Sequence, residues 1–364
     1  MSNLADKGII LGVCGGIAAY KVADLASKLT QAGALVDVVM TAGAQRFITP
    51  LTFNALTHRP VRTDLYGDWL GDDTGHVALA HTAAALVVAP ATANTIARLA
   101  LGLSDDLLGA IALSTRAPLL IAPAMEPGMY AHPATQGHLA TLQSRGAAIM
   151  EPEAGRMASG RSGVGRLPDT ADIVGALRAL LGRGGPLAGR HIVVTAGGTQ
   201  EPLDPVRYVG NRSSGQMGWA LAEAARDLGA SVTLIHGPVA LSPPYGVTAV
   251  AVGTTAELEA AVRAAVVGAA ALIMAAAPAD YRAAQVAPQK LKKQPGADTF
   301  TLAMAKNPDI LAGLRDLPGT ERLVRVGFAA ETEDLRANAA HKLIAKGLHL
   351  IVANEATASI GAAS

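Results

Sequence analysis

The stretch Ile9-Ile10-Leu11-Gly12-Val13-Cys14-Gly15-Gly16 is an apolar strand that breaks into a glycine-rich turn. A helix-like run follows as far as Ala32, and a second strand is predicted over residues 35–40. In such a unit the glycines let the backbone approach a ligand closely, and the first N–H groups of the helix point at an anion. The stretch therefore predicts a parallel α/β unit that handles a phosphate-bearing ligand.

A second stretch, Ile192-Val193-Val194-Thr195-Ala196-Gly197-Gly198, has the same pattern. After a longer loop it leads to a helix predicted over residues 215–228 and a strand over 231–235. Two such openings in 364 residues predict two nucleotide-handling domains. The segment Gly182-Arg183-Gly184-Gly185-Pro186 is the strongest linker signal, and we expect domains over residues 1–188 and 189–364.

Composition favours parallel sheets covered by helices on both faces. Apolar residues make up 50% of the chain and aromatic residues 3%, so small and aliphatic side chains do most of the packing. A net charge of +1 gives no electrostatic case for nucleic-acid binding. The single cysteine excludes an intramolecular disulfide framework and fits a reducing cytoplasm. The polar N-terminus and the short apolar run at residues 83–93 predict neither a signal peptide nor a membrane span.

Strand and helix signals alternate in both halves. The predicted strands are 9–13, 35–40, 85–89, 118–122, 147–150, 191–195, 231–235, 248–251, 271–275, 324–328 and 348–352. The predicted helices are 17–32, 45–56, 92–101, 104–115, 134–145, 171–181, 215–228, 255–267, 308–315 and 333–346. This alternation predicts an α/β protein with two doubly wound, Rossmann-like parallel-sheet domains.

Residues suited to ligand binding follow the predicted strands of the first half. Thr41-Ala42-Gly43-Ala44-Gln45-Arg46-Phe47 follows the second strand, where a hydroxyl can meet a phosphate and an aromatic side chain can meet a ring. Ala89-Pro90-Ala91-Thr92-Ala93-Asn94-Thr95 ends the third strand and opens a helix. Ser104-Asp105-Asp106 either caps the next helix or faces a ligand. Because open α/β sheets bind ligands at the carboxyl ends of their strands, these segments predict one site.

Together these segments resemble the flavin-dependent cysteine decarboxylase family over roughly residues 7–180. The resemblance lies in Gly-Gly-Ile-Ala-Ala-Tyr-Lys (15–21), Gly-His-Val-Ala-Leu (75–79), Ala-Pro-Ala-Thr-Ala-Asn (89–94) and Pro-Ala-Met (123–125). It implies FMN as cofactor and decarboxylation of a cysteine-type carboxylate, with His76 as the active-site base. The FMN contacts that it implies are Gly15, Gly16, Ile17, Thr41, Phe47, Ala91, Thr92, Asn94, Ser104 and Met125.

Three positions depart from the family pattern. Cys14 replaces a Ser or Thr, and a thiol is a poorer phosphate donor than a hydroxyl. Glu126 replaces an Asn suited to the substrate carboxylate, which an ionised Glu126 would repel unless it is protonated or turned away. Ser159 replaces a cysteine in a mobile flap, which in the coenzyme A branch acts as the acid that completes reduction of an enethiol intermediate.

These departures leave three interpretations of the first half. Another group protonates the intermediate, or the product remains an enethiol, or this half binds flavin without turnover. The fused second half favours the first interpretation. The flap also carries three arginines, which suit a phosphorylated substrate or form a solvated basic loop: Arg156, Arg161 and Arg166.

The second half contains a polar loop that ends at a helix N-terminus. This loop runs from Gly197 to Gly210-Asn211-Arg212-Ser213-Ser214-Gly215, where hydroxyls and helix amides can hold phosphate. Three lysines further along could hold phosphate or form a solvated charge run: Lys290, Lys292 and Lys293. Other motifs are Ala277-Pro278-Ala279-Asp280-Tyr281-Arg282, Lys306-Asn307-Pro308-Asp309-Ile310 and Gly327-Phe328-Ala329-Ala330-Glu331-Thr332.

These motifs resemble the phosphopantothenate–cysteine ligase family over roughly residues 189–358. Bacterial members use CTP and Mg²⁺ to activate the phosphopantothenate carboxylate as an acyl-cytidylate, and the amine of cysteine then displaces CMP. The resemblance implies that Asn211 stabilises the acyl-cytidylate and that Lys290 acts on the phosphates or the developing charge; it does not identify metal ligands. The implied CTP contacts are Met274, Ala275, Ala276, Asp280, Lys290, Pro308, Asp309, Ile310, Leu311, Phe328, Lys342 and Lys346.

The two resemblances together imply a bifunctional enzyme of coenzyme A biosynthesis in the cytoplasm. Its small-molecule partners would be 4′-phosphopantothenate, cysteine and CTP. The alternatives are an oxidative cysteine decarboxylase that releases an enethiol and a flavin-binding regulatory protein. The resemblances also imply a homo-oligomer, with trimer contacts through the flavin domain and dimer contacts through the ligase domain. Family members continue beyond the position of Ser364, so we expect a ligase domain shortened at its C-terminus.

Overall fold

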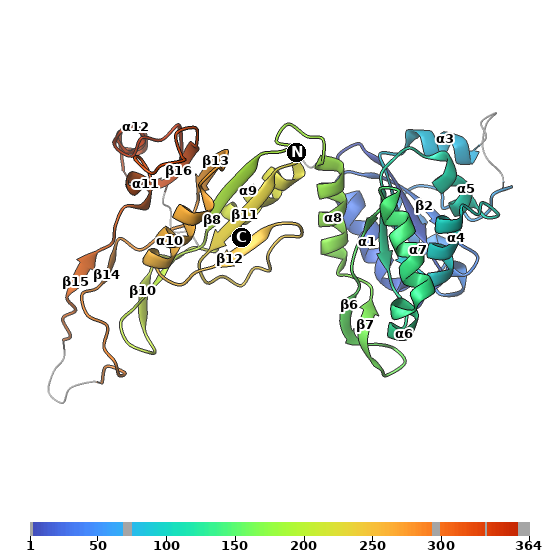
Figure 1. Cartoon of the computed structure of the whole chain (residues 1–364), viewed down its shortest axis with the longest axis horizontal. Helices are drawn as coiled ribbons and strands as arrows, with labels where there is room; N and C mark the ends of the chain where they lie inside the picture. Colours follow the sequence, from blue (N-terminus) through green and yellow to red (C-terminus); the bar gives the residue numbers. More distant parts are fainter. Residues whose placement is uncertain (1–2, 68–74, 293–298, 332, 356–364) are drawn as a thin grey trace. The chain divides into compact units, whose positions relative to one another are not determined.

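The structure, a computed structural model, describes residues 3–67, 75–292, 299–331 and 333–355. The chain forms two compact units, Met1–Gly182 and Arg183–Ser364. Each unit has a parallel sheet with helices packed on it, which confirms the predicted α/β class (Figure 1). Among the described residues, no helix combines the length and the apolar character needed to cross a membrane.

The first unit is built on a five-stranded parallel sheet with the order β2-β1-β3-β4-β5. Its strands are β1 (Gly8–Val13), β2 (Leu35–Met40), β3 (Ala85–Ala91), β4 (Leu119–Pro123) and β5 (Ala148–Ile149), and a separate hairpin joins β6 (Glu153–Arg156) to β7 (Ser162–Arg166). Its helices are α1 (Ala19–Gln31), α2 (Pro50–Thr57), α3 (Gly75–Thr82), α4 (Ala93–Leu101), α5 (Leu107–Ser114), α6 (Pro127–Ala131), α7 (Pro133–Ser144) and α8 (Thr170–Gly182). The strand order reverses between β1 and β3, and α/β sheets bind ligands at such a switch point.

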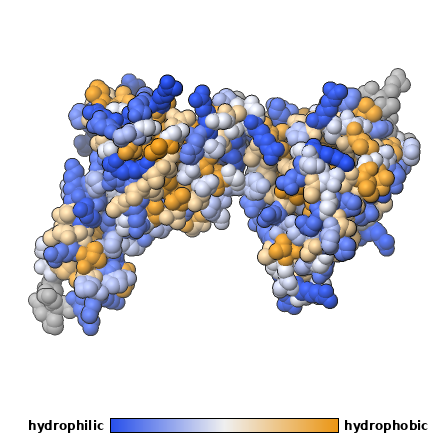
Figure 2. All heavy atoms as spheres, in the orientation of Figure 1, coloured by the Kyte–Doolittle hydropathy of each residue, from blue (hydrophilic) through white to orange (hydrophobic). Residues whose placement is uncertain are grey.

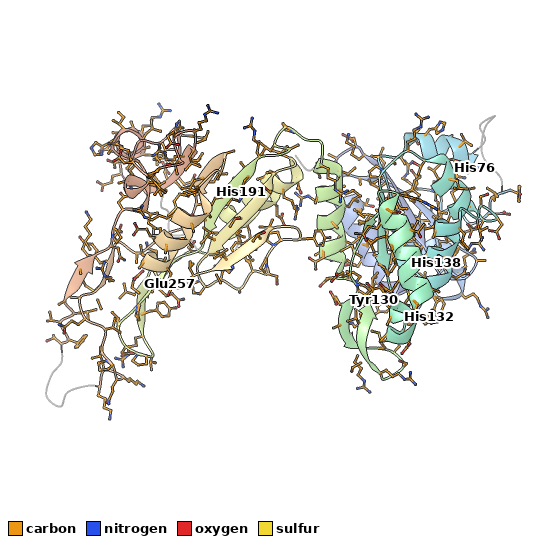
Figure 3. All side chains as sticks on the ribbon, in the orientation of Figure 1. His76, Tyr130, His132, His138, His191 and Glu257 are labelled. Atoms are coloured by element: carbon orange, nitrogen blue, oxygen red, sulfur yellow. The ribbon has the colours of Figure 1, made fainter. Side chains whose placement is uncertain are left out.

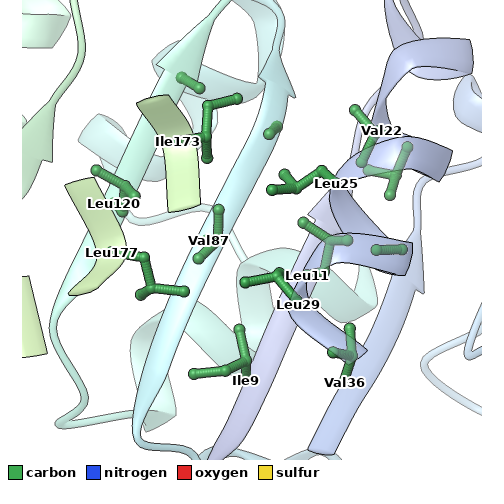
Figure 4. Packing of buried hydrophobic residues seen from close by; sticks show 14 of the residues in the cluster. Ile9, Leu11, Val22, Leu25, Leu29, Val36, Val87, Leu120, Ile173 and Leu177 are labelled. Atoms are coloured by element: carbon green, nitrogen blue, oxygen red, sulfur yellow. The ribbon is translucent and has the colours of Figure 1, made fainter. Parts of the chain in front are cut away.

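Two apolar layers hold the first sheet between its helices. Ile9 and Leu11 point to the face that α1 and α8 cover (Figure 4), where they pack with Val22, Leu25 and Leu177. The other face of the same strands packs against α4, α5 and α7. Because successive strand residues point to opposite faces, a continuous apolar run is needed to cover a sheet on both sides.

The second unit has a six-stranded parallel sheet with the order β12-β11-β8-β13-β16-β17. Its strands are β8 (His191–Ala196), β11 (Ser231–His236), β12 (Thr248–Ala251), β13 (Ala271–Met274), β16 (Val324–Glu331) and β17 (Leu350–Glu355). This unit also has two hairpins. One joins β9 (Gln200–Pro202) to β10 (Tyr208–Gly210), and the other joins β14 (Tyr281–Ala283) to β15 (Met304–Lys306). Its helices are α9 (Gln216–Asp227), α10 (Thr255–Ala265), α11 (Ile310–Gly313) and α12 (Leu335–Ala345). In order of sequence this sheet is 3-2-1-4-5-6, with its switch point between β8 and β13.

The predicted helix over residues 45–56 is wrong as a single element. Residues Ala44–Arg46 form a 3₁₀ turn, and α2 begins only at Pro50. Thr49 is extended, with φ −87° and ψ 152°, because a proline disfavours helical geometry in the residue before it. The predicted helix over 308–315 shortens to α11. The sequence patterns did not indicate α3, and α6 and the hairpin strands are too short to give a periodic signal.

Gly15 is required by a close approach between two backbone segments. A Cβ atom added there would lie 2.7 Å from the carbonyl carbon of Gly43 and 2.8 Å from its Cα. We expect Gly15→Ala to lower the free energy of unfolding by about 1–3 kcal/mol, because backbone must move to admit the methyl group. Chemical denaturation measures this change. Gly184→Ala is the control, since nothing lies within 4 Å of a Cβ there, and equal stability of the two variants would contradict the prediction.

Candidate functional site

The first unit has a cavity of about 1030 Å³ at the carboxyl ends of its strands. Its lining comes from the turn after β1, the loop after β2, the start of α4 and the segment after β4, so the cavity spans the switch point. The volume is at the upper end of the range for cofactor sites. The structure brings nine of the predicted residues together here: Gly15, Gly16, Ile17, Thr41, Thr92, Asn94, Met125, Glu126 and Ser159.

Four other predicted residues of the first unit do not line this cavity. Ala91 is fully buried in β3, and Phe47 is half exposed outside the lining. Ser104 is also exposed outside it. The cap of α5 is Asp106, which accepts a hydrogen bond from the Gly109 N–H at 2.8 Å. His76 lies in the first turn of α3, apart from α6 (Figure 3). The contacts of these four residues with a ligand therefore stay predictions.

The structure explains how Glu126 is accommodated in the cavity wall. Its Oε2 atom caps α6, accepting hydrogen bonds from the Gly128 N–H at 2.7 Å and the Met129 N–H at 3.3 Å. Its Oε1 atom lies 3.6 Å from the Nη1 atom of Arg161 in the flap. The carboxylate is thus turned toward its own helix, which is one of the two ways in which it avoids repelling a substrate carboxylate.

The cavity lining also contains charged residues that the sequence patterns did not assign. Arg98 pairs with Asp105 and with Asp106, whose Oδ2 atom is 3.4 Å from the guanidinium. Three further cations of the lining have no ion-pair partner among the described residues: Lys21, Arg156 and Arg166. The cavity therefore combines helix N-termini and hydroxyls with unpaired positive charge, a set of groups that suits anionic ligands.

Cys14, the only cysteine of the chain, is fully buried beside this cavity. Burial raises the pKa of its thiol from 9.0 to about 11, although a hydrogen bond with Thr95 acts in the opposite direction. The thiol therefore loses its proton at lower pH in the unfolded chain than in the folded chain. Because deprotonation favours the unfolded chain, the free energy of unfolding is unaffected below pH 9 and falls as pH rises toward 11.

We expect the free energy of unfolding to fall with pH more steeply in the native sequence than in Cys14→Ser, by about 1.4 kcal/mol per pH unit between pH 9 and 11. Denaturant titrations of both proteins at several pH values measure the difference. At pH 8 the folded protein is also expected to leave a thiol-specific reagent unreacted until it is denatured. Parallel pH profiles, or rapid labelling of the folded chain, would show that this assignment is wrong.

In the second unit, the ends of β8 and β13 bring several predicted ligase residues together. The Ala277 N–H donates to the Gly197 carbonyl at 2.8 Å, and the Ala276 N–H donates to Thr195 Oγ1 at 3.1 Å. The Asn211 Nδ2 atom donates to the Pro278 carbonyl at 2.9 Å. Asn211 and the segment from Met274 to Asp280 therefore share the switch point of this sheet.

The predicted contacts near α11 have two different environments. Asp309 caps α11 through the Ala312 N–H at 3.1 Å and pairs with Lys346 at 3.0 Å. Burial raises the pKa of Asp309, but these partners outweigh it and hold the pKa below its usual range. Ile310 and Leu311 are instead 3% and 7% exposed, so their side chains pack in the core and only their backbone remains for a ligand.

The other predicted ligase residues lie on the elements around this site. Met274 is buried, and its sulfur accepts a hydrogen bond from Thr195 Oγ1 at 3.2 Å. Phe328 is half-buried on β16, and Lys342 is half-buried on α12. Lys290 is exposed between β14 and β15, with no ion-pair partner among the residues that the structure describes, while Lys293 lies outside those residues.

A buried polar network, which no local pattern could reveal, connects the hairpins of the second unit. Glu201 accepts hydrogen bonds from the Thr255 N–H at 2.8 Å and the Thr255 hydroxyl at 2.7 Å. Asn307 donates to the Ala279 carbonyl at 2.8 Å and accepts from Arg282 at 2.9 Å. The network ties β9, α10 and the β14–β15 hairpin together, and the Asn307 N–H also donates to the Asp280 carbonyl at 2.8 Å, so it fixes the backbone at Asp280.

No group of three or more His, Cys, Asp or Glu side chains in the described parts of the chain is arranged to hold a metal ion.

Comparison with known proteins assigns both units. Residues 1–182 match the flavoprotein family, and residues 187–363 match the family of DNA/pantothenate metabolism flavoprotein C-terminal domains. The curated relatives that match include three from different genera, each named coenzyme A biosynthesis bifunctional protein CoaBC. The Vibrio vulnificus YJ016 protein is 46% identical over 98% of this chain and 88% of its own length. The Escherichia coli K12 protein is 47% identical over 97% and 87%, and the Mycobacterium tuberculosis CDC 1551 protein is 46% identical over 96% and 86%.

Two doubly wound units, each with polar residues at its switch point, define a two-domain flavoprotein of pantothenate metabolism. The identity extends over both units at nearly full length. The chain belongs to the CoaBC family of bifunctional coenzyme A biosynthesis proteins.

Proposed function

We propose that the chain catalyses two consecutive steps of coenzyme A biosynthesis. Residues 189–364 join 4′-phosphopantothenate to cysteine at the expense of CTP, and residues 1–188 decarboxylate the product, phosphopantothenoylcysteine, to 4′-phosphopantetheine. The observation that carries this proposal is the 46% identity to a bifunctional relative over 98% of the chain, which includes both switch-point sites.

In the ligase half, a carboxylate oxygen of 4′-phosphopantothenate attacks the α-phosphorus of CTP and releases pyrophosphate. The amine of cysteine then attacks the acyl carbon of the acyl-cytidylate and releases CMP. Asn211 holds the acyl-cytidylate, and Lys290 stabilises negative charge that develops on the phosphates. Mg²⁺ would bind together with CTP, because oxygen is the ligand type that this ion prefers.

In the decarboxylase half, the Gly15–Gly16 turn and the start of α4 hold FMN, with Thr41, Thr92 and Asn94 as polar contacts. FMN bound there would supply reversible two-electron chemistry: it would take two electrons from the cysteine side chain, so that the carboxylate can leave as CO₂, and would return them to the product, so that the net reaction is decarboxylation. Arg156 and Arg166 of the flap hairpin, which have no ion-pair partner among the described residues, bind the phosphate of the substrate. The carboxylate of Glu126 stays hydrogen-bonded to the N-terminus of α6, so it does not repel the carboxylate of the substrate.

We also propose that the decarboxylase site is completed by a second copy of the chain within a homo-oligomer that has trimer contacts through this half and dimer contacts through the ligase half. His76 does not line the cavity of its own chain. Ile17, Tyr20 and Met129 line that cavity and are 60%, 62% and 50% exposed. Figure 2 shows that the visible face of each unit otherwise mixes apolar and polar residues. A flavin and a neighbouring subunit would cover these three side chains.

Ser159 supports a second candidate function for the first half. It lines the cavity at the position of the flap cysteine, and a hydroxyl is a weaker acid than a thiol. The alternative is an oxidative cysteine decarboxylase whose product is the enethiol.

One incubation separates these functions. The protein is mixed with 4′-phosphopantothenate, cysteine, CTP and Mg²⁺, and every product is identified by mass spectrometry. We expect 4′-phosphopantetheine, CMP and pyrophosphate. A product two hydrogens lighter supports the enethiol alternative, and accumulated phosphopantothenoylcysteine indicates a first half that binds flavin without turnover. Absence of any ligated product would overturn the proposal.

A further inference from the structure

Asp204, in the loop between β9 and β10, is a buried carboxylate that neither proposed reaction uses. It is 3% exposed, and its Oδ1 atom accepts hydrogen bonds from the Val206 N–H at 2.7 Å and the Arg207 N–H at 2.8 Å. Its Oδ2 atom accepts a third bond, from the Leu291 N–H at 3.0 Å. Burial raises the pKa of Asp204, but these donors and Arg207 outweigh it and lower the pKa. A carboxylate held in this way stays ionised at neutral pH.

The loop that carries Asp204 makes further hydrogen bonds to the segment around Leu291. The Arg207 Nη1 atom donates to the Leu291 carbonyl at 2.9 Å, so both polar groups of the Leu291 backbone are held. The Ala287 N–H donates to the Leu203 carbonyl at 2.9 Å. The nitrogen of Leu291 belongs to the peptide bond that joins it to Lys290. The bond from Asp204 therefore fixes the peptide plane next to that lysine.

The side chain of Lys290 is itself exposed and unpaired among the described residues. A flexible lysine stabilises a transition state only when its starting point is fixed, because otherwise ordering it costs entropy at the moment of reaction. The carboxylate of Asp204 supplies that anchor through the backbone, and it leaves the ammonium group of Lys290 free for phosphate.

We infer that Asp204 is a positioning residue for the ligation step, which holds the backbone of Lys290 in place through its hydrogen bond to Leu291. This inference rests on the proposed role of Lys290 in charge stabilisation.

Asp204→Asn tests the inference with little change in shape. The amide oxygen can still accept the Val206 and Arg207 N–H groups, whereas the NH₂ group faces the Leu291 N–H and cannot accept from it. We expect kcat for ligation to fall about 10- to 100-fold, with a smaller change in KM for CTP. Decarboxylation of added phosphopantothenoylcysteine should not change. Asp316→Asn, at an exposed aspartate, is the matched control.

A double-mutant cycle separates positioning from a general structural role. If Asp204 acts through Lys290, adding Asp204→Asn to Lys290→Ala causes little further loss of the residual ligation rate. Asp204→Ser, whose hydroxyl can keep the turn but is too short to reach Leu291, should behave like Asp204→Asn.

The outcomes are distinct. An unchanged kcat in Asp204→Asn, or losses that multiply in the double variant, would overturn the inference and leave the role of Lys290 intact. Full ligation by Lys290→Ala would instead overturn the proposed role of Lys290.

Discussion

Alanine in place of His76 is expected to lower the turnover of phosphopantothenoylcysteine by about 10²- to 10⁴-fold, the range for loss of an acid–base group. Bound flavin should remain because the groups proposed to hold it, the turn after β1 and the start of α4, are unchanged, and ligation should remain because the ligase site lies in the other unit. Absorbance of the purified protein measures flavin content, and product analysis measures both activities. His81→Ala, at an exposed position on the same helix, is the control.

A mixing experiment tests whether His76 acts on the cavity of another copy. Gly16→Tyr is expected to fill the cavity without moving the backbone, since a Cβ there meets only Thr92 Cγ2, at 3.7 Å. Each variant alone should lack decarboxylation. Oligomers that contain both chains, isolated through two different tags, should regain it, because an intact cavity on one chain meets an intact His76 on another. Mixed oligomers without activity would refute shared sites.

Alanine in place of Lys290 is expected to reduce kcat for ligation by about 10²- to 10³-fold, the scale for removal of one preorganised group that stabilises developing charge. Lys290 is exposed, has no ion-pair partner among the described residues, and directly precedes Leu291, whose backbone Asp204 and Arg207 hold. The measurement follows CMP release at saturating CTP. Lys292→Ala, an exposed lysine two positions further along, should retain most of the activity. Equal losses in both variants would favour a solvated charge run over a specific role.

The order of strands and helices could be predicted from the sequence because its signals are local. The apolar runs at residues 9–13 and 192–196 are followed by glycines, which mark the ends of strands without any knowledge of the fold. The turn around Gly15 could be predicted for the same reason. Pro50 is an equally local signal: it favours an extended Thr49, so it divides the predicted helix over residues 45–56.

The parts of the site that escaped prediction depend on distant partners or on side-chain direction. The bond between Asp204 and Leu291 joins residues that are 87 positions apart. The turn of Glu126 toward the Gly128 N–H is a choice of rotamer, which the residue type does not determine. The position of His76 outside its own cavity depends on where α3 packs, and no periodicity in the sequence encodes that.

The burial of Cys14 has a practical and chemical consequence. The proposed substrates and products, cysteine and its derivatives, all carry thiols, which exchange readily with accessible protein disulfides and thiols. A chain whose only sulfhydryl is sealed in the core offers them nothing to exchange with. Any thiol that reacts in a mixture containing the folded enzyme therefore belongs to a metabolite. Because ligation and decarboxylation each keep the thiol of cysteine, the total thiol in such a mixture should stay constant through both steps. With its only cysteine protected in this way, the chain is also a ready background in which one engineered surface cysteine can carry a probe.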